Sequence, residues 1–356
     1  MAGEGEEARA IADSVPNDAD AEASANAALA LATVEKNRGS SEGIRAHAPA
    51  AIELARRAGA VDVEIQALDA LAWADFWMTP LEAAYPEAHG KWERASALAR
   101  SAGDLTLAAR AKGFAALAAD FRLDMSAADR GVDEAMALAE AAGSMRALVP
   151  VHTAAARARE LQGRPEEALQ HGRRWFDLAI QAGERLDAVA ACAFGLSPPL
   201  RLLGRLDEAW AATEDGLAIV REMEGTAYEA AVRWERVRLL LLWGRTDEAD
   251  EELDRMGQNF DPSDELMNRE WGSAEGPVRA AQERDQEAEA QWRRAIGPGE
   301  RDWFVAENLI AFGRFLLDRG RSEDARPIVA QVWDIVEGTG ALLLERQVEE
   351  LRARLP

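Results

Sequence analysis

Cysteine is almost absent from this chain: Cys192 is the single one in 356 residues, so no disulfide can form within the chain. The amino-terminal segment MAGEGEEARAIADS has neither the basic start nor the apolar stretch of a secretory signal. Long apolar runs are missing too, since the densest, LLLLW ending at Trp243, is far shorter than the ~20 residues that cross a bilayer. We therefore expect a cytoplasmic protein with no membrane-spanning segment.

Positive charge is in deficit, with 41 Lys and Arg against 64 Asp and Glu and a formal net charge of -23. Such an excess of acid repels phosphate backbones, because nucleic-acid binding depends on Lys and Arg that neutralise phosphates. The composition therefore argues against DNA or RNA as a direct partner. Tyrosine is scarce as well, while Ala, Leu, Glu and Arg dominate, and these residues favour helix almost everywhere.

Signatures of catalysis are also lacking. The four histidines, His47, His89, His152 and His171, are scattered and show no zinc-site spacing. There is no Walker loop and no Gly-x-Ser-x-Gly motif. The acidic run 247–254 is similar to the magnesium-binding carboxylates of all-α prenyl-transferring enzymes, but no second acidic cluster faces it. We therefore predict no catalytic residues, no metal ligands and no cofactor.

What the sequence does contain is a repeated turn, Gly-Arg-x-acid-acid-Ala, which begins at Gly163, Gly204, Gly244 and Gly320. The glycine can adopt the left-handed conformation that ends a helix, and the acids then lie in the first turn of the next helix, where its dipole favours negative charge. The alanine permits two helices to approach closely. Including weaker copies, the alanines stand about forty residues apart, at 88, 128, 168, 209, 249, 288 and 325.

A second signature ends the other helix of each unit, as in ELARRAG at Gly59 and ALARSAG at Gly103. The two signatures together predict an all-α chain of about eight helix pairs. Because a single pair cannot bury its apolar face alone, neighbouring pairs must stack into one solenoid domain over 18–356. Residues 1–17 are expected to be an acidic leader. The predicted units are 18–59, 61–103, 104–143, 144–183, 184–225, 226–260, 263–299 and 300–338, with a capping helix at 340–354.

These patterns resemble the tetratricopeptide (TPR) superfamily, which shares the turn glycine, a small residue seven positions before it and the alanine five positions after it. The period near forty resembles the long TPR-like repeats at the C-terminal ends of bacterial transcription activators of the MalT type. The resemblance covers nearly the whole chain and implies a right-handed α-α superhelix. It also implies that the first helix of each pair lines a concave face.

The register of the resemblance selects the concave-face residues on which we base the site prediction. Aromatic and arginine side chains are enriched at interface hot spots. Acids on the same stripe, such as Asp120, Glu160 and Glu307, can instead pair with the arginines in a solvated ladder that contributes little. Four further tryptophans, on second helices, are expected to pack between units: Trp175, Trp210, Trp292 and Trp333. The predicted binding residues are Trp73, Trp77, Arg157, Phe194, Arg201, Trp234 and Arg238.

Three places break the pattern because proline removes an amide donor and disturbs the preceding turn: Met78-Thr79-Pro80, Ser197-Pro198-Pro199 and Gly276-Pro277. The second interrupts the expected first helix of the fifth unit. Such a break either exposes carbonyl groups toward a more closed site near Phe194, Ser197 and Arg201, or only adjusts the superhelix. The structural alternative is favoured.

The sequence thus favours a non-catalytic binding scaffold whose concave groove recognises a peptide, a protein partner or a small anionic effector. A close variant makes the chain the sensor or oligomerisation region of a bacterial signalling regulator. The alternative is an enzyme on an all-α repeat scaffold with a central cavity. A deep closed cavity with converging buried carboxylates or histidines would favour the enzyme.

Overall fold

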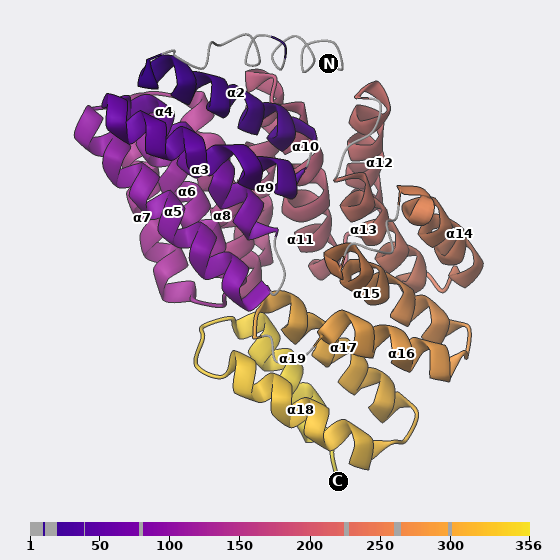
Figure 1. The fold of residues 1–356 in the computed structure, drawn as a ribbon. Helices are drawn as coiled ribbons and strands as arrows, with labels where there is room; N and C mark the ends of the chain where they lie inside the picture. Colours follow the sequence, from indigo (N-terminus) through magenta and orange to yellow (C-terminus); the bar gives the residue numbers. More distant parts are fainter. Residues whose placement is uncertain are drawn as a thin grey trace. The chain divides into compact units, whose positions relative to one another are not determined.

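The computed structural model describes residues 10, 20–38, 40–77, 81–223, 228–259, 265–297 and 301–356. Within these ranges all regular secondary structure is helical and no strand occurs (Figure 1). The predicted leader, 1–17, lies outside the described residues apart from Ala10, as does the Met78-Thr79-Pro80 break. No helix in the described part of the chain has both the length and the apolar character needed to span a membrane.

The helices follow one another in pairs, as the repeat predicts. The first four pairs are α2 (Ala21–Arg38) with α3 (Ser41–Ala58), α4 (Val61–Phe76) with α5 (Leu81–Ala102), α6 (Leu105–Phe121) with α7 (Met125–Ala142), and α8 (Met145–Leu161) with α9 (Pro165–Ala182).

The fifth pair begins with a composite helix, and a single helix follows the eighth pair. The remaining elements are α10 (Arg185–Ala190), η1 (Ala191–Leu196) and α11 (Ser197–Leu202) with α12 (Leu206–Glu222), α13 (Glu229–Leu242) with α14 (Thr246–Met256) and the short η2 (Gly257–Asn259), α15 (Glu265–Ala281) with α16 (Asp285–Ile296), α17 (Trp303–Asp318) with α18 (Ser322–Val336), and α19 (Leu342–Ala353).

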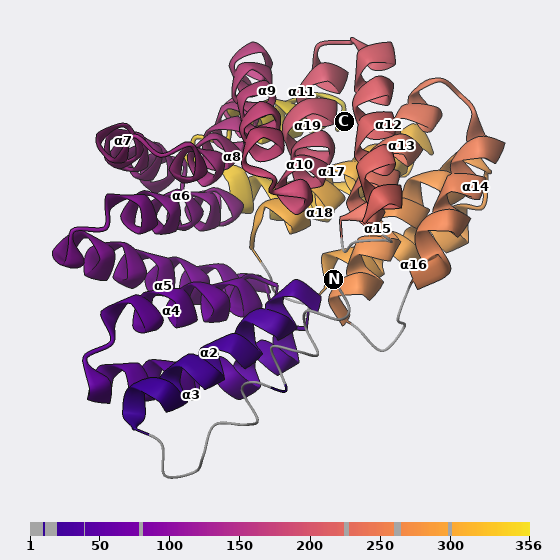
Figure 2. The same cartoon turned by 90° about the horizontal axis from the view of Figure 1, so that it is seen from above.

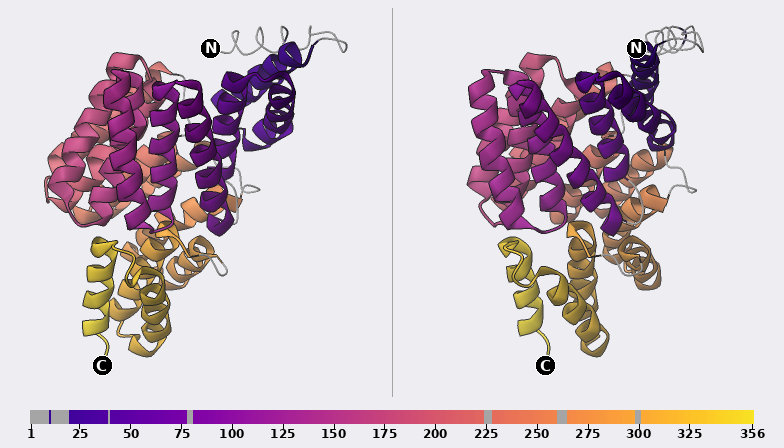
Figure 3. Two further views of the ribbon diagram at one scale, coloured as in Figure 1. Left: turned by 90° about the vertical axis from the view of Figure 1, so that its left-hand side faces the viewer. Right: turned by 60° about the vertical axis from the view of Figure 1, so that its left-hand side comes forward.

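The chain divides into two compact units. The first takes in residues up to Ala119 together with Arg130–Val151, and the second comprises Asp120–Asp129 together with His152–Pro356. In the first unit α2 packs against α3 and α4, α3 against α4, and α4 against α5, and the four helices lie side by side in Figure 2. In the second unit α17, α18 and α19 pack together, as the yellow end of the ribbon shows (Figure 3). That 18–356 forms one repeat domain remains a prediction.

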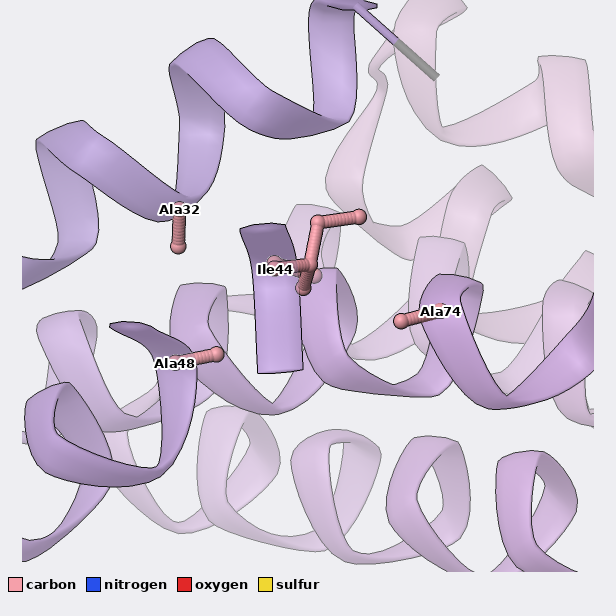
Figure 4. Packing of buried hydrophobic residues seen from close by; sticks show 5 residues of the cluster. Ala32, Ile44, Ala48 and Ala74 are labelled. Carbon is pink, nitrogen blue, oxygen red and sulfur yellow. The ribbon is translucent and has the colours of Figure 1, made fainter. Parts of the chain in front are cut away.

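Small residues hold neighbouring helices close together. In the first unit Ala32, Ile44 and Ala48 pack with Ala70 and Ala74, so α2, α3 and α4 share one small apolar cluster (Figure 4). The repeat alanines play the role expected of them, since every one is fully buried. They are Ala88, Ala128, Ala168, Ala209, Ala249, Ala288 and Ala325.

The repeated turn is built as the sequence predicts, with one addition. The turn glycines Gly163, Gly204, Gly244 and Gly320 have φ near +70°, whereas Leu123 and Glu283 adopt φ of 61° in the weaker copies. The arginine that follows this left-handed residue precedes the second helix and binds the acid three residues later. In four turns its Nε and Nη2 donate to the two oxygens of one glutamate, as in Arg164–Glu167, Arg205–Glu208, Arg245–Glu248 and Arg284–Glu287.

The predicted interruptions within α10–α11 and α15 do not break the helices. Ser197 donates its amide to the carbonyl of Cys192, five residues earlier, so the chain passes from α10 through the π-helical η1 into α11. Pro198 and Pro199 then occupy the first turn of α11, where proline is tolerated. Likewise α15 runs through Pro277.

Candidate functional site

Three of the seven predicted binding residues lie in one charged layer of the second unit, and a fourth lies beside it. Arg157 extends from α8, Arg201 from α11, and Trp234 and Arg238 from α13, all first helices of their pairs. We define the inner layer as Arg157, Glu160, Ser197, Arg201, Glu235, Arg238 and Glu307. Trp234 flanks this layer, and Glu307 belongs to α17, the first helix of the eighth pair.

Glu235 connects the members of the inner layer. Its Oε2 accepts hydrogen bonds from Arg201 Nε at 3.3 Å and from Ser197 Oγ at 3.4 Å. Its Oε1 accepts one from Arg238 Nη1 at 3.1 Å. Arg238 then donates from Nη2 to Glu307 Oε2 at 3.0 Å, so the network joins α11, α13 and α17. The continuation of the helix through η1 places Ser197 and Arg201 opposite Glu235.

Arg157 forms the base of the layer. Its Nη1 donates to Glu160 Oε2 at 2.9 Å, one helical turn away on α8. The centre of its guanidinium group lies 4.5 Å from the ring centre of Trp303 and 5.5 Å from that of Phe121. The two rings are in edge contact, 5.1 Å apart, so the end of α6 and the start of α17 meet over this arginine.

Aromatic rings border the layer on its other side. Arg238 stacks over Trp234 at 4.1 Å, and Trp234 lies 6.3 Å from Phe304 of α17. Arg269 of α15 is buried beside Phe304 and donates to the backbone carbonyls of Ala295 and Ile296. Stacking of a guanidinium group on a ring restricts its orientation, so Arg238 and Arg269 are constrained by Trp234 and Phe304.

Exposure divides the inner layer into a base and an accessible edge. The side chains of Arg157, Glu160 and Glu235 are each 5% exposed. Those of Arg201, Arg238 and Glu307 are 19%, 25% and 23% exposed. An incoming molecule can therefore contact the edge directly, whereas the base supports it from beneath.

Two acids of the layer, Glu160 and Glu307, and the neighbouring Asp120 have shifted pKa values. Burial raises the pKa of Asp120, beside the layer at the end of α6, to about 8, although Arg157 opposes the rise. Burial also raises the pKa of Glu160, again against the effect of Arg157. For Glu307 burial acts in the same direction, but the guanidinium groups of Arg238 and Arg157 outweigh it and hold the pKa below its ordinary value.

The other three predicted residues lie elsewhere. Phe194 is half-buried and packs with Tyr228 in an apolar cluster of α10, η1 and α12. Trp73, in the first unit, forms edge contacts with Trp92 and Phe114. Trp77 contacts Phe76 in the same unit. All three aromatics contact neighbouring rings, and their role in partner binding stays a prediction.

A pair of histidines was missed by sequence reasoning. His152 and His171 lie on α8 and α9 with their Nδ1 atoms 2.9 Å apart. Burial lowers the pKa of both rings, that of His152 to about 4, where the charges of His171 and Arg174 add to the effect. The sequence could have indicated this pair. Residues at similar distances before and after the turn that joins two helices, here the turn at Gly163, lie opposite each other.

The features that would indicate catalysis are only partly present. Buried carboxylates do converge, but Glu160, Glu235 and Glu307 each accept a hydrogen bond from an arginine. Among the described residues, no group of three acidic, histidine or cysteine side chains is placed to hold a metal ion. A surface hollow of about 400 Å³ lies away from the inner layer, between the α8–α9 turn and α19.

No protein-family model matches this chain, and no curated protein matches it. Solved structures resemble it at the level of fold. A Rap protein in complex with Competence and Sporulation Factor superposes with a TM-score of 0.55 at 15% identity, covering 99% of this chain and 94% of the Rap chain. The human IFIT1 dimer with PPP-AAAA gives 0.53 at 13% identity, covering 98% of this chain and 74% of that one.

A third similar structure is a signal transduction ATPase with a tetratricopeptide repeat sensor from Pyrococcus horikoshii. Its TM-score is 0.50 at 11% identity, and the match covers 91% of this chain and 52% of that chain. The all-α, TPR-like helical-repeat fold predicted from the sequence is thereby confirmed.

Proposed function

We propose that this protein is a non-catalytic binding scaffold, and that the edge of the inner layer binds an extended segment of a peptide or protein partner. The observation that carries the proposal is that partly exposed donors and an acceptor lie together on three first helices: Arg201 on α11, Arg238 on α13 and Glu307 on α17. These side chains are held in place by Glu235 and Trp234, so binding would cost little ordering of the surface.

The charge balance of the inner layer favours a peptide over a small anion. At its partly exposed edge both arginines, Arg201 and Arg238, are already paired with glutamates, so the edge has no unpaired positive charge to attract an anion. A peptide backbone, in contrast, presents both N–H and C=O groups along its length. It therefore needs the donors and acceptors that this surface offers together.

The structural likenesses support the same reading at the level of fold. The similar Rap protein structure is a complex with Competence and Sporulation Factor. The similar ATPase has a tetratricopeptide repeat sensor. We propose that the present chain works in the cytoplasm, without nucleic acid as a direct partner, and that the sensor of a bacterial signalling regulator is one setting for such a scaffold.

The test compares two double variants of the full chain. Arg201→Gln with Arg238→Gln removes two charges from the inner layer. Arg205→Gln with Arg245→Gln removes two charges from exposed repeat turns and is the matched control. Trp234→Ala is less informative, because Trp234 is 8% exposed and truncating a packed tryptophan costs roughly 3–5 kcal/mol of stability.

Native mass spectrometry of each protein, gently purified from its source, gives the outcome. We expect a retained polypeptide on the wild type and on the control, and its loss from the Arg201/Arg238 variant. Retention by both variants would contradict the proposed location. A retained small molecule in place of a polypeptide would contradict the peptide assignment.

A further inference from the structure

Beneath the exposed edge, Arg157 presents an unfilled hydrogen-bonding face. The residue is 4% exposed, and only its Nη1 is engaged, by Glu160. Within the described part of the chain its Nε and Nη2 are buried and have no hydrogen-bond partner. These two nitrogens form the side-on fork of a guanidinium group, whose parallel N–H bonds match the two oxygens of a carboxylate.

The same fork is occupied elsewhere in this protein. In the repeat turns the Nε and Nη2 of Arg164, Arg205, Arg245 and Arg284 each grip both oxygens of a glutamate carboxylate. Those arginines are on the surface, where their N–H groups can also donate hydrogen bonds to water. The fork of Arg157 is buried, where leaving two charged donors without partners costs free energy.

The groups around Arg157 fix the fork and add further polar atoms. The rings of Trp303 and Phe121 both contact the guanidinium group, and Glu160 accepts a hydrogen bond from its Nη1. Both carboxyl oxygens of Asp120 are buried and, among the described residues, have no hydrogen-bond partner. The indole Nε1 of Trp303 is in the same situation. Unpartnered donors and acceptors therefore gather at one place.

We propose that the Nε and Nη2 fork of Arg157 binds the carboxylate group of a ligand, with the Asp120 carboxyl group and the Trp303 indole as neighbouring polar contacts. The carboxylate has two sources that share this chemistry. It is either the C-terminus of the peptide bound at the inner layer, in which case the inference rests on the proposed function, or a free small carboxylic acid.

Charge favours a carboxylate over a phosphate. The two parallel donors of the fork can bind either anion, but a carboxylate carries a single negative charge. A phosphate carries up to two charges and three further oxygens, and Glu160 and Glu307 both contribute negative charge at Arg157. Asp120 does not oppose a monoanion at neutral pH, because burial raises its pKa to about 8 and its protonated form can donate a hydrogen bond.

The experiment observes the fork directly by NMR of the full chain labelled with 15N-arginine. Arg157→Lys, which keeps the charge but lacks the fork, identifies the Arg157 Nε–H signal by its disappearance. Sodium acetate is then titrated into the wild type, with acetamide as the neutral probe of similar shape. Two pools of random pentapeptides, one with free C-termini and one with C-terminal amides, form the second arm.

We expect a saturable shift of the Arg157 Nε–H signal with acetate, with the free-acid peptides, or with both, and none with acetamide or amidated peptides. A shift with acetate alone identifies a small acid, and a shift with free-acid peptides alone identifies a peptide C-terminus. The Nε–H signal of Arg205, whose fork Glu208 already fills, is the internal control and should not move.

An Arg157 signal that neither acetate nor free-acid peptides move would overturn the proposal and assign the fork to internal water. The result of this titration can be distinguished from the result of the mass-spectrometric test of the proposed function. Loss of partner from the Arg201/Arg238 variant with a silent Arg157 signal would refute only the carboxylate site. An acetate-responsive Arg157 signal with no effect of the Arg201/Arg238 variant would refute only the proposed partner-binding edge.

Discussion

Arg238 on α13 donates from Nη2 to Glu307 Oε2 on α17 at 3.0 Å, although 69 positions separate the two residues in the sequence. Ion pairs within one repeat unit follow from the period, but this one joins the first helices of the sixth and eighth pairs. It shows that α17 faces α13 across the inner layer, with the aromatic pair Trp234 and Phe304 beside it.

The Arg238–Glu307 pair predicts a measurable coupling. Both side chains are about a quarter exposed, so solvent weakens the attraction, and we expect a coupling of about 1 kcal/mol. Urea unfolding of Arg238→Gln, Glu307→Gln and the double variant gives this value as a double-mutant cycle. A coupling below about 0.3 kcal/mol would mean that the pair does not stabilise the contact between α13 and α17.

Asp120 predicts a loss of stability as the pH rises. Its pKa in the folded protein is about 8, against an ordinary value of 3.8. Between these values the unfolded chain releases the proton while the folded chain retains it, so this group lowers the free energy of unfolding by up to about 1.4 kcal/mol per pH unit. Below about pH 4 both states are protonated, and above about pH 8 the loss is complete.

Asp120→Asn removes this titration. We therefore expect the variant to gain stability relative to the wild type between pH 5 and pH 8, as measured by urea unfolding at both values. Asp254→Asn, at an exposed position on α14, serves as the control. Equal pH dependence in the wild type and Asp120→Asn would show that Asp120 is not buried in its neutral form.

The repeat alanines predict overpacking when they are enlarged. Ala168 is fully buried, and leucine there should lower the free energy of unfolding by roughly 1–3 kcal/mol. Ala211→Leu, on the exposed face of α12, should change it by less than about 0.5 kcal/mol. Thermal unfolding compares the stabilities of the two variants. Equal losses of stability would contradict the idea that Ala168 allows two helices to approach closely.

A close backbone contact predicts opposite effects at two helical glycines. A Cβ atom on Gly172 of α9 would lie 1.8 Å from the carbonyl oxygen of Gly195 in η1, so Gly172→Ala should be strongly destabilising. A Cβ atom on Gly90 of α5 would meet nothing within 4 Å, so Gly90→Ala should stabilise by roughly 0.5–1 kcal/mol. Differential scanning calorimetry distinguishes them, and a neutral Gly172→Ala would contradict the contact.

Local chemistry explains why the sequence predicts the fold well. The turn glycines and the buried alanines act within one helix pair, so their spacing suffices to place the helices. The prolines led to a wrong prediction of a helix break at Ser197-Pro198-Pro199. There the chain forms the π-helical η1 and the helix continues into α11. The register also placed Arg157, Arg201, Trp234 and Arg238 on one face.

The rest of the candidate site depends on contacts between distant units. Glu235 stands one position beyond the predicted stripe, yet it bonds both Arg201 and Arg238. Trp303 contacts both Phe121 and Arg157, which brings α17 against the end of α6. The spacing of the repeats does not predict this contact. The sequence pattern also did not indicate the ring contacts of Trp73 with Trp92 and Phe114, or that of Phe194 with Tyr228.

The most direct test of the binding face is hydrogen–deuterium exchange of the protein with and without its purified partner. We expect slower amide exchange in α11, α13 and α17, which carry Arg201, Arg238 and Glu307, and no change in the paired helices α12, α14 and α18. Protection confined to α12, α14 and α18, or none in the second unit, would contradict the assignment of the inner layer as the partner-binding surface.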